Sequence, residues 1–406
     1  MMKKIFKIIG LLIVIFLIIG GIFSYMLNSN FKNLGHVELV DNKNNDTIPF
    51  RYSNSGHILI DVSLDNNKTF PFILDSGASN MIFENFQSRK DLDNNGYSIG
   101  IGSSGSIFWS TIKRINHLRI GNLKFKNLHF KSVDINFECL DAYGIIGIGV
   151  MRQLVWEIDF AKKIIIISDK IKNEVANKNA LKFELSDNRF GHQLSIPIKL
   201  SKNSKIIQAT VDIGNNSNLS LNEKYILEDS LSFSNKKIYG RGSSGLGDSE
   251  DEEFDEKLYL IDTLVFSRSK YEIHNFPIIA GQEGINLLGL GFFKKYKTTI
   301  SWKDKKLIIE PYDSIQNYKW KISGFATRFN KKEKNIVVNS LIENSPASHK
   351  KISINEEVYS INGMRPLNEK EYCQMQLNLK NEDTLELKLL HENTIKNVQI
   401  IKQFIF

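Results

Sequence analysis

The sequence predicts a mainly β protein with two repeated β-barrel lobes in a pseudo-twofold arrangement, an α+β domain after them and one N-terminal transmembrane helix before them. Three observations predict this fold class: a long apolar run, a set of motifs that occurs twice, and a change of pattern after Pro311. The 406 residues allow two to four domains. The expected division is an anchor over 1–27, a first lobe over 28–172, a second lobe over 173–313 and a C-terminal domain over 314–406.

The apolar run extends over residues 8–27 without a charge. At about 1.5 Å per residue, a helix of this length spans a hydrocarbon core. Because Lys3, Lys4 and Lys7 precede it, we expect a cytoplasmic N-terminus, with the rest of the chain in the periplasm or on the cell surface. A cleaved signal peptide is the alternative, which the length of the run and the lack of a small-residue cleavage site disfavour.

Composition excludes several classes of protein. Hydrophobic residues make up 42% and charged residues 24% of the chain, which argues against a disordered or polytopic membrane protein. Cys139 and Cys373 are too few and too far apart for a disulfide scaffold or a four-cysteine zinc site, and we expect unpaired core thiols. The net charge of +8 is dispersed, so we expect attraction to an anionic membrane surface and no nucleic-acid binding.

Four motifs occur in the same order in both lobes. An apolar strand runs into Asp-x-Gly at Asp75 and again at Asp212, 137 positions later. Short β-branched and aromatic runs bounded by Gly, Asn and Asp predict small barrels, with helix mainly at 149–154 and 291–296. The other repeated motifs are the glycine clusters Gly100–Gly105 and Gly240–Gly245, the segments Ile145–Gly147 and Leu287–Gly289, and strand pairs that begin near Val155 and Lys297.

One carboxylate on the same loop of each lobe predicts a pair of Asp side chains at the pseudo-twofold axis. Two carboxyls a few Å apart cannot both ionise easily, so they share a proton. The ionised group can act as a general base on water while the protonated group polarises a substrate carbonyl. Asp75 and Asp212 are therefore the candidate catalytic residues, and the glycine in each motif lets the backbone approach closely.

The run Asp75-Ser76-Gly77-Ala78, the glycine-rich hairpin after it and Ile145-Ile146-Gly147 resemble the retropepsin-like aspartic protease family in its bacterial, single-chain, two-lobed form. The resemblance implies catalysis by Asp75 and Asp212 without a metal or cofactor. It also implies that each glycine hairpin is a flap over the substrate. The implied loop-supporting residues are Ser76, Gly77, Ala78 and Gly214, and the implied flap residues are Gly100, Gly102, Gly105, Gly240, Gly242 and Gly245.

The second motif departs from the family pattern, because Ile213 stands where Thr or Ser is usual. Isoleucine has no hydroxyl to bond the partner loop. We therefore expect that the pair is held less rigidly or that Asp212 is not catalytic. Asp61 and Asp159 are expected outside the site.

Other chemistries fit the motifs less well. Both glycine clusters satisfy G-x-G-x-x-G, but a strand rather than a helix follows the first cluster, which favours a hairpin tip over nucleotide binding. No G-x-S-x-G or H-E-x-x-H motif is present, which disfavours serine and metal hydrolysis. The run 248–256 carries seven acids in nine residues and is either a solvated loop or a gate that disfavours acidic substrates.

Residues 318–406 resemble a PDZ domain, most closely in Ser345-Pro346-Ala347 and in Val358–Gly363. We expect its second helix at about 368–377. His349–Ile352 and Asn355–Glu357 depart from the pattern, and a PDZ-like fold that only packs on the lobes is the alternative. The resemblance implies a loop that binds the C-terminal carboxylate of a peptide, formed by Ile322, Ser323, Gly324 and Phe325.

The sequence thus predicts a membrane-anchored aspartic endopeptidase whose PDZ domain recruits or regulates peptide substrates. The alternative is a weak or inactive pseudoprotease that binds peptides or proteins in the cell envelope. Ile213 favours this alternative, whereas Asp75–Gly77 and the two glycine flaps favour the enzyme. A third interpretation, an envelope scaffold, has no motif of its own, and the sequence leaves the oligomeric state open.

Overall fold

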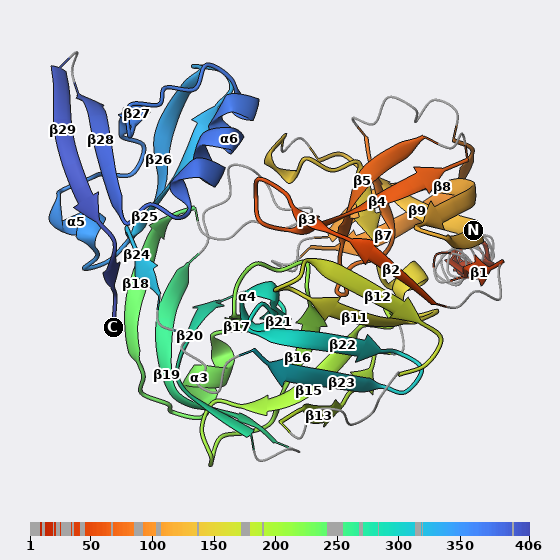
Figure 1. Ribbon diagram of the computed structural model, residues 1–406. Helices are drawn as coiled ribbons and strands as arrows, with labels where there is room; N and C mark the ends of the chain where they lie inside the picture. Colours follow the sequence, from red (N-terminus) through yellow and green to blue (C-terminus); the bar gives the residue numbers. More distant parts are fainter. Residues whose placement is uncertain are drawn as a thin grey trace, which may run out of the picture.

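The computed structural model is mainly β, with 54% strand and 13% helix, and its sheets form barrels (Figure 1). The residues that the structure describes are 9, 13–18, 20–21, 25, 34, 36–40, 45–65, 68–84, 92–102, 107–135, 138–171, 179–188, 191–241, 255–267, 271–282, 284–312, 318, 320–391 and 394–406.

The expected transmembrane helix, and with it the single-pass location, is wrong for the structure as described. Within the described ranges, no helix has both the length and the apolar character needed to cross a membrane.

The first lobe is a barrel closed by six strands. Each strand pairs with the next in the order given below, and the last pairs back to the first. β10 lies between β5 and β6, which are consecutive in the chain, and it is parallel to β5 and antiparallel to β6. The six strands are β4 (Ile58–Leu64), β5 (Thr69–Leu74), β10 (Gly144–Ile146), β6 (Met81–Phe83), β9 (Leu123–Val133) and β8 (Ile107–Ile120).

The second lobe repeats this closed order strand for strand. β21 is again parallel to one neighbour and antiparallel to the other, so it matches β10. Both barrels have apolar interiors because their strands alternate or are buried on both faces. The strands are β15 (Leu194–Lys199), β16 (Ile207–Asp212), β21 (Leu287–Gly289), β17 (Leu219–Asn222), β20 (Tyr271–Gly281) and β19 (Glu256–Phe266).

Each barrel carries a hairpin at the expected flap position, made by β7 (Asn94–Ile101) with β8 and by β18 (Ser234–Gly240) with β19. Helices α2 (Ile148–Met151) and α4 (Leu290–Phe293) follow the repeated glycines, close to where they were expected. The smaller elements of the lobes are β1 (Glu38–Leu39), β3 (Arg51–Tyr52), η2 (Glu138–Leu140), β14 (Ser186–Asp187) and α3 (Lys224–Glu228).

A six-stranded sheet joins the lobes with three strands from each. At its centre β11 pairs antiparallel with β22, and Trp156, Ile158 and Ile300 on these strands are fully buried. One apolar cluster runs through both lobes, so the two halves share a core. The order is β2 (Asn45–Pro49), β12 (Ile164–Ser168), β11 (Val155–Asp159), β22 (Tyr296–Ser301), β23 (Lys306–Pro311) and β13 (Leu181–Glu184).

The C-terminal module has its own core. Its first helix begins at Pro346 because Ser345 caps it and accepts the Ser348 amide hydrogen at 3.3 Å. The second begins after Asn368, whose side chain accepts the Glu371 amide hydrogen at 2.9 Å. The elements are β24 (Lys321–Ile322), β25 (Phe325–Asn330), β26 (Asn335–Ile342), α5 (Pro346–His349), β27 (Glu357–Ile361), α6 (Glu369–Leu379), β28 (Thr384–His391), β29 (Thr394–Ile401) and β30 (Gln403–Phe404).

The module is fastened to both lobes. β18 of the second hairpin pairs with β26, which extends the second-lobe sheet into the module (Figure 1). Cys139 and Cys373 form a disulfide between the first lobe and α6, so the expectation of unpaired thiols is wrong. Their Cα atoms are 5.0 Å apart despite a separation of 234 residues, because the fold brings η2 against α6.

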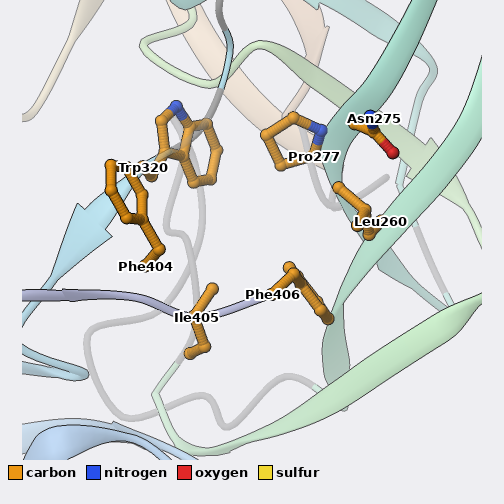
Figure 2. A pocket seen from close by; sticks show the side chains of 7 residues that line it. All are labelled: Leu260, Asn275, Pro277, Trp320, Phe404, Ile405 and Phe406. Atoms are coloured by element: carbon orange, nitrogen blue, oxygen red, sulfur yellow. The ribbon is translucent and has the colours of Figure 1, made fainter.

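The last residues of the chain form a third contact between the C-terminal module and the second lobe. A pocket of about 180 Å³ lies between β19, β20 and the last residues of the chain. Figure 2 shows Trp320 and Phe404 on the left of this pocket, Leu260 and Pro277 on the right, and Ile405 and Phe406 below. This apolar seam packs the end of the chain against the second lobe.

Candidate active site

Asp75 and Asp212 occupy equivalent places in the two lobes. Asp75 directly follows β5, and Asp212 is the last residue of β16. Each strand lies beside the short inserted strand of its barrel, β10 or β21, which fixes where the loop after it points. The two side chains are buried, with 9% and 8% of their surface exposed, and their carboxyls share a hydrogen bond. The structure therefore brings the two predicted residues together.

The glycines of the two motifs make this approach possible. A Cβ atom at Gly77 would lie 2.6 Å from Cγ of Asp212, and one at Gly214 would lie 2.3 Å from Cγ of Asp75. Ordinary contacts to a Cβ begin at about 3.4 Å. Each carboxyl thus rests against the glycine of the opposite loop, and only glycine leaves room for it.

Each loop also turns around its own carboxylate. Asp75 Oδ1 accepts the amide hydrogens of Gly77 at 2.7 Å and Ala78 at 3.1 Å. Asp212 Oδ1 accepts the amide hydrogen of Gly214 at 2.8 Å. These are the local turns that Asp forms with the backbone that follows it, and they orient the free oxygen of each carboxyl.

The environment favours one shared proton. Burial raises the pKa of both Asp75 and Asp212. The negative charge of Asp75 raises the pKa of Asp212 further, and the hydrogen bond between the two carboxyls lowers the pKa of Asp75. The arrangement thus favours a protonated Asp212 and an ionised Asp75.

Ser76 ties the first loop to the second. Its Oγ donates to the Val211 carbonyl at 2.7 Å and accepts the Ile213 amide hydrogen at 3.0 Å. Ile213 is fully buried in the core and has no hydroxyl to return the tie. Because Ile213 replaces the usual Thr or Ser, only the Ser76 hydroxyl connects the two loops at these positions. The Asp75 and Asp212 carboxyls nevertheless lie together.

The segments that follow β10 and β21 donate hydrogen bonds to the two Asp-x-Gly loops. Ala78 accepts the Ile148 amide hydrogen at 2.9 Å through its carbonyl, and Asn80 accepts that of Gly147 at 2.9 Å through its side chain. In the second lobe, Asn215 accepts the Leu290 amide hydrogen at 2.6 Å through its carbonyl. The helices α2 and α4 thus begin against the two Asp-x-Gly loops.

The expected flap residues fall in different surroundings. Gly100 lies in β7, where its backbone packs against the ring of Phe108, and Gly102 follows that strand. Gly240 ends β18 with φ +82° and lies against the Asn339 carbonyl of β26. The second hairpin therefore docks on the C-terminal module at this end. The other flap residues, Gly105, Gly242 and Gly245, and acidic residues 248–254 lie outside the described part of the chain.

Two cross-lobe contacts had not been predicted. Asn216, just beyond the second motif, donates to the Ser55 carbonyl at 3.0 Å and to Nε2 of His57 at 3.2 Å. Gln193 donates to the Gly77 carbonyl at 3.4 Å. Spacing relates His57 to Gln193, which follows it by nearly the repeat offset of the two Asp residues, but it does not reveal the partner of either residue in the opposite lobe.

Asp61 and Asp159 are engaged elsewhere. Asp61 is exposed and pairs with Arg51 at 3.0 Å. Asp159 is buried and accepts the Tyr312 hydroxyl hydrogen at 3.0 Å. As to metals, no group of three or more His, Cys, Asp and Glu side chains gathers as ligands would, so far as the chain is described.

The expected peptide-binding loop lies between β24 and β25. Ile322 pairs with Gln403, and the carbonyls of Ser323 and Gly324 accept the amide hydrogens of Ala347 at 3.0 Å and Ile342 at 2.8 Å. Phe325 begins β25.

Two side chains of α6 bridge to β25 at Thr327. The Tyr372 hydroxyl donates to the Thr327 carbonyl, and Gln376 donates to Oγ1 of Thr327 at 2.9 Å. A peptide strand that used the Thr327 carbonyl would have to displace Tyr372.

Comparison with known proteins adds no assignment: no protein-family model matches the chain, and no curated protein is similar to it.

Proposed function

We propose that the chain is an aspartic endopeptidase of the retropepsin-like type, with Asp75 and Asp212 as its catalytic pair. The observation that carries the proposal is the buried, hydrogen-bonded contact of these two carboxyls at equivalent ends of two matching barrels. When two neighbouring carboxyls have different pKa values, one can act as a general base and the other as a general acid on the same amide bond.

In this mechanism Asp75 begins ionised and Asp212 begins protonated. Asp75 takes a proton from water as the water oxygen attacks the peptide carbonyl carbon, and Asp212 gives its proton to the carbonyl oxygen. The tetrahedral intermediate then collapses: the C–N bond breaks, Asp75 passes its proton to the leaving nitrogen, and Asp212 regains a proton from a hydroxyl of the intermediate. Both carboxyls return to their starting states, so the cycle needs no other reactant than water.

The proposal includes a role for the C-terminal module in recruiting or regulating peptide substrates. The contacts favour regulation. Tyr372 occupies the Thr327 carbonyl, which a recruited strand would need. In addition, β26 pairs with β18, so a movement of the module would move the second hairpin.

The test is cleavage of a peptide library by the purified full-length chain, followed by mass spectrometry. We expect cleavage by the wild type and a loss of at least about 1,000-fold in Asp75→Asn and Asp212→Asn, because either change removes a proton-transfer group. Asp159→Asn is the matched control, since it makes the same change at an equally buried carboxyl outside the pair. Cleavage that survives both dyad substitutions would exclude this mechanism.

The second candidate is a peptide-binding pseudoprotease, which one observation favours: Ile213 returns no tie to the first loop. It predicts that library peptides bind the wild type, and bind Asp75→Asn equally well, without cleavage between pH 3 and pH 8. Cleavage that depends on Asp75 would exclude it.

A further inference from the structure

Two residues that the proposed mechanism does not use stand at matching places just before the first barrel strand of each lobe. His57 precedes β4, and Gln193 precedes β15. Each side chain reaches the catalytic loop of the opposite lobe, His57 through Asn216 and Gln193 through the Gly77 carbonyl. The pair thus obeys the same pseudo-twofold relation as the two Asp residues.

The contact at His57 is made of three hydrogen bonds. Asn216 Nδ2 spans from Nε2 of His57 to the Ser55 carbonyl, and Nδ1 of His57 lies 2.8 Å from Oγ of Ser55. Because an amide nitrogen only donates, Nε2 must accept, which places the imidazole proton on Nδ1. Burial, with Lys294 and Lys380 nearby, lowers the pKa of His57 to about 4, so the ring is in this neutral form at neutral pH. Ser55, neutral His57 and Asn216 therefore form a set of hydrogen bonds between the lobes, which we call the cross-lobe lock, and none of its bonds requires a charged group.

The position of the lock connects it to the dyad. Asn216 is two residues beyond Gly214, the glycine against which the Asp75 carboxyl rests. The His57 ring itself contacts the Gly214 backbone. A displacement of the segment that contains Gly214 and Asn216 would therefore move the surface that supports Asp75.

Further cross-lobe hydrogen bonds are needed because Ser76 alone connects the two Asp-x-Gly loops through a hydroxyl. Ser76 holds the second loop at residues 211 and 213, but no hydroxyl at position 213 holds the first loop in return. Gln193 supplies a bond to that first loop, and the contact of Asn216 with Ser55 and His57 supplies more bonds between the lobes. On the proposed peptidase function, we infer that His57 and Gln193 are positioning residues, and that their cross-lobe hydrogen bonds hold the two catalytic loops in register where Ile213 cannot.

The test compares His57→Ala, His57→Gln and Asn216→Ala in the full-length chain. His57→Ala and Asn216→Ala are expected to lower kcat about 10-fold each with KM within about twofold, because substrate contacts stay in place while the reacting groups shift. The double variant is expected to lose little more than either single one, since both remove the same lock. His57→Gln keeps an amide like that of Gln193 and is expected to recover most of the kcat.

His274→Ala is the matched control. His274 lies on β20 and bonds Thr263 on the neighbouring strand of the same lobe, so its loss leaves the cross-lobe contacts intact. We expect its kcat to stay within about twofold of the wild type. Equal losses of kcat in His57→Ala and His57→Gln, or additive losses in the double variant, would overturn the positioning role.

A second readout does not depend on activity. Hydrogen exchange of the peptide that contains residues 211–217 is expected to rise in His57→Ala and to stay near wild type in His57→Gln and His274→Ala. If the wild type cleaves nothing, the proposed function fails while this exchange result still decides whether the lock holds the loop. Unchanged exchange in His57→Ala would overturn the inference even in an active enzyme.

Discussion

A single methyl group at Gly214 should separate the catalytic pair. The Cβ of Gly214→Ala would lie 2.3 Å from Cγ of Asp75, whereas ordinary contacts begin at about 3.4 Å. Either the Asp75 carboxyl or the second loop must therefore move by about 1 Å. A misplacement of about 1 Å of reacting groups costs about 100-fold in rate, so we expect kcat to fall by about this factor.

Steady-state cleavage of a peptide that the wild type cuts measures this effect. Gly77→Ala should behave alike, because its Cβ would lie 2.6 Å from Cγ of Asp212. Gly20→Ala is the control, since nothing lies within 4 Å of its Cβ position. A kcat for Gly214→Ala within about threefold of the wild type would refute the claim that the carboxyls work from their observed positions.

Three further predictions concern the Ser76 hydroxyl, the raised pKa of Asp212 and the disulfide. Ser76→Ala should lower kcat about 10-fold in the same assay, while Ser76→Thr, which keeps the hydroxyl that bridges residues 211 and 213, should stay within about threefold. Because burial and the charge of Asp75 raise the folded-state pKa of Asp212, the wild type should lose stability as pH rises above about 4, the ordinary Asp value. Denaturation of Asp212→Asn at several pH values should show less of this loss, and an unchanged pH dependence would contradict the raised pKa. Reduction of Cys139–Cys373 should lower the unfolding free energy by about 2 to 5 kcal/mol, because the bond closes a separation of 234 residues, and a thermal melt with and without reductant that showed no change would disprove this contribution.

Repetition is what made the site predictable. Two Asp-x-Gly loops at one offset, each after an apolar strand, predict that two carboxylates occupy equivalent places, and a twofold relation brings equivalent loops together. Each carboxyl lies against the glycine of the opposite Asp-x-Gly motif, so the sequence also predicted that the two loops approach closely. The short helices after Gly147 and Gly289 followed from the repeat in the same way.

Contacts between unlike parts of the chain were not predictable. His57 and Asn216 belong to no motif, and their meeting depends on how the lobes pack. The pairing of β18 with β26 needs the edges of two separate sheets to meet. Cysteine spacing cannot reveal that η2 lies against α6, so the disulfide was missed. Hydropathy alone predicted a transmembrane helix that no described helix provides.

The proposed mechanism depends on a proton shared by Asp75 and Asp212, and titration of these carboxyls detects that proton. Carbon-13 carboxyl NMR of Asp-labelled protein, with signals assigned from Asp75→Asn and Asp212→Asn, follows both groups over pH 2 to 9. We predict that the pair still holds one proton well above the ordinary Asp value of about 3.9, and that Asp212 carries it. Two independent titrations near that ordinary value would contradict the dyad.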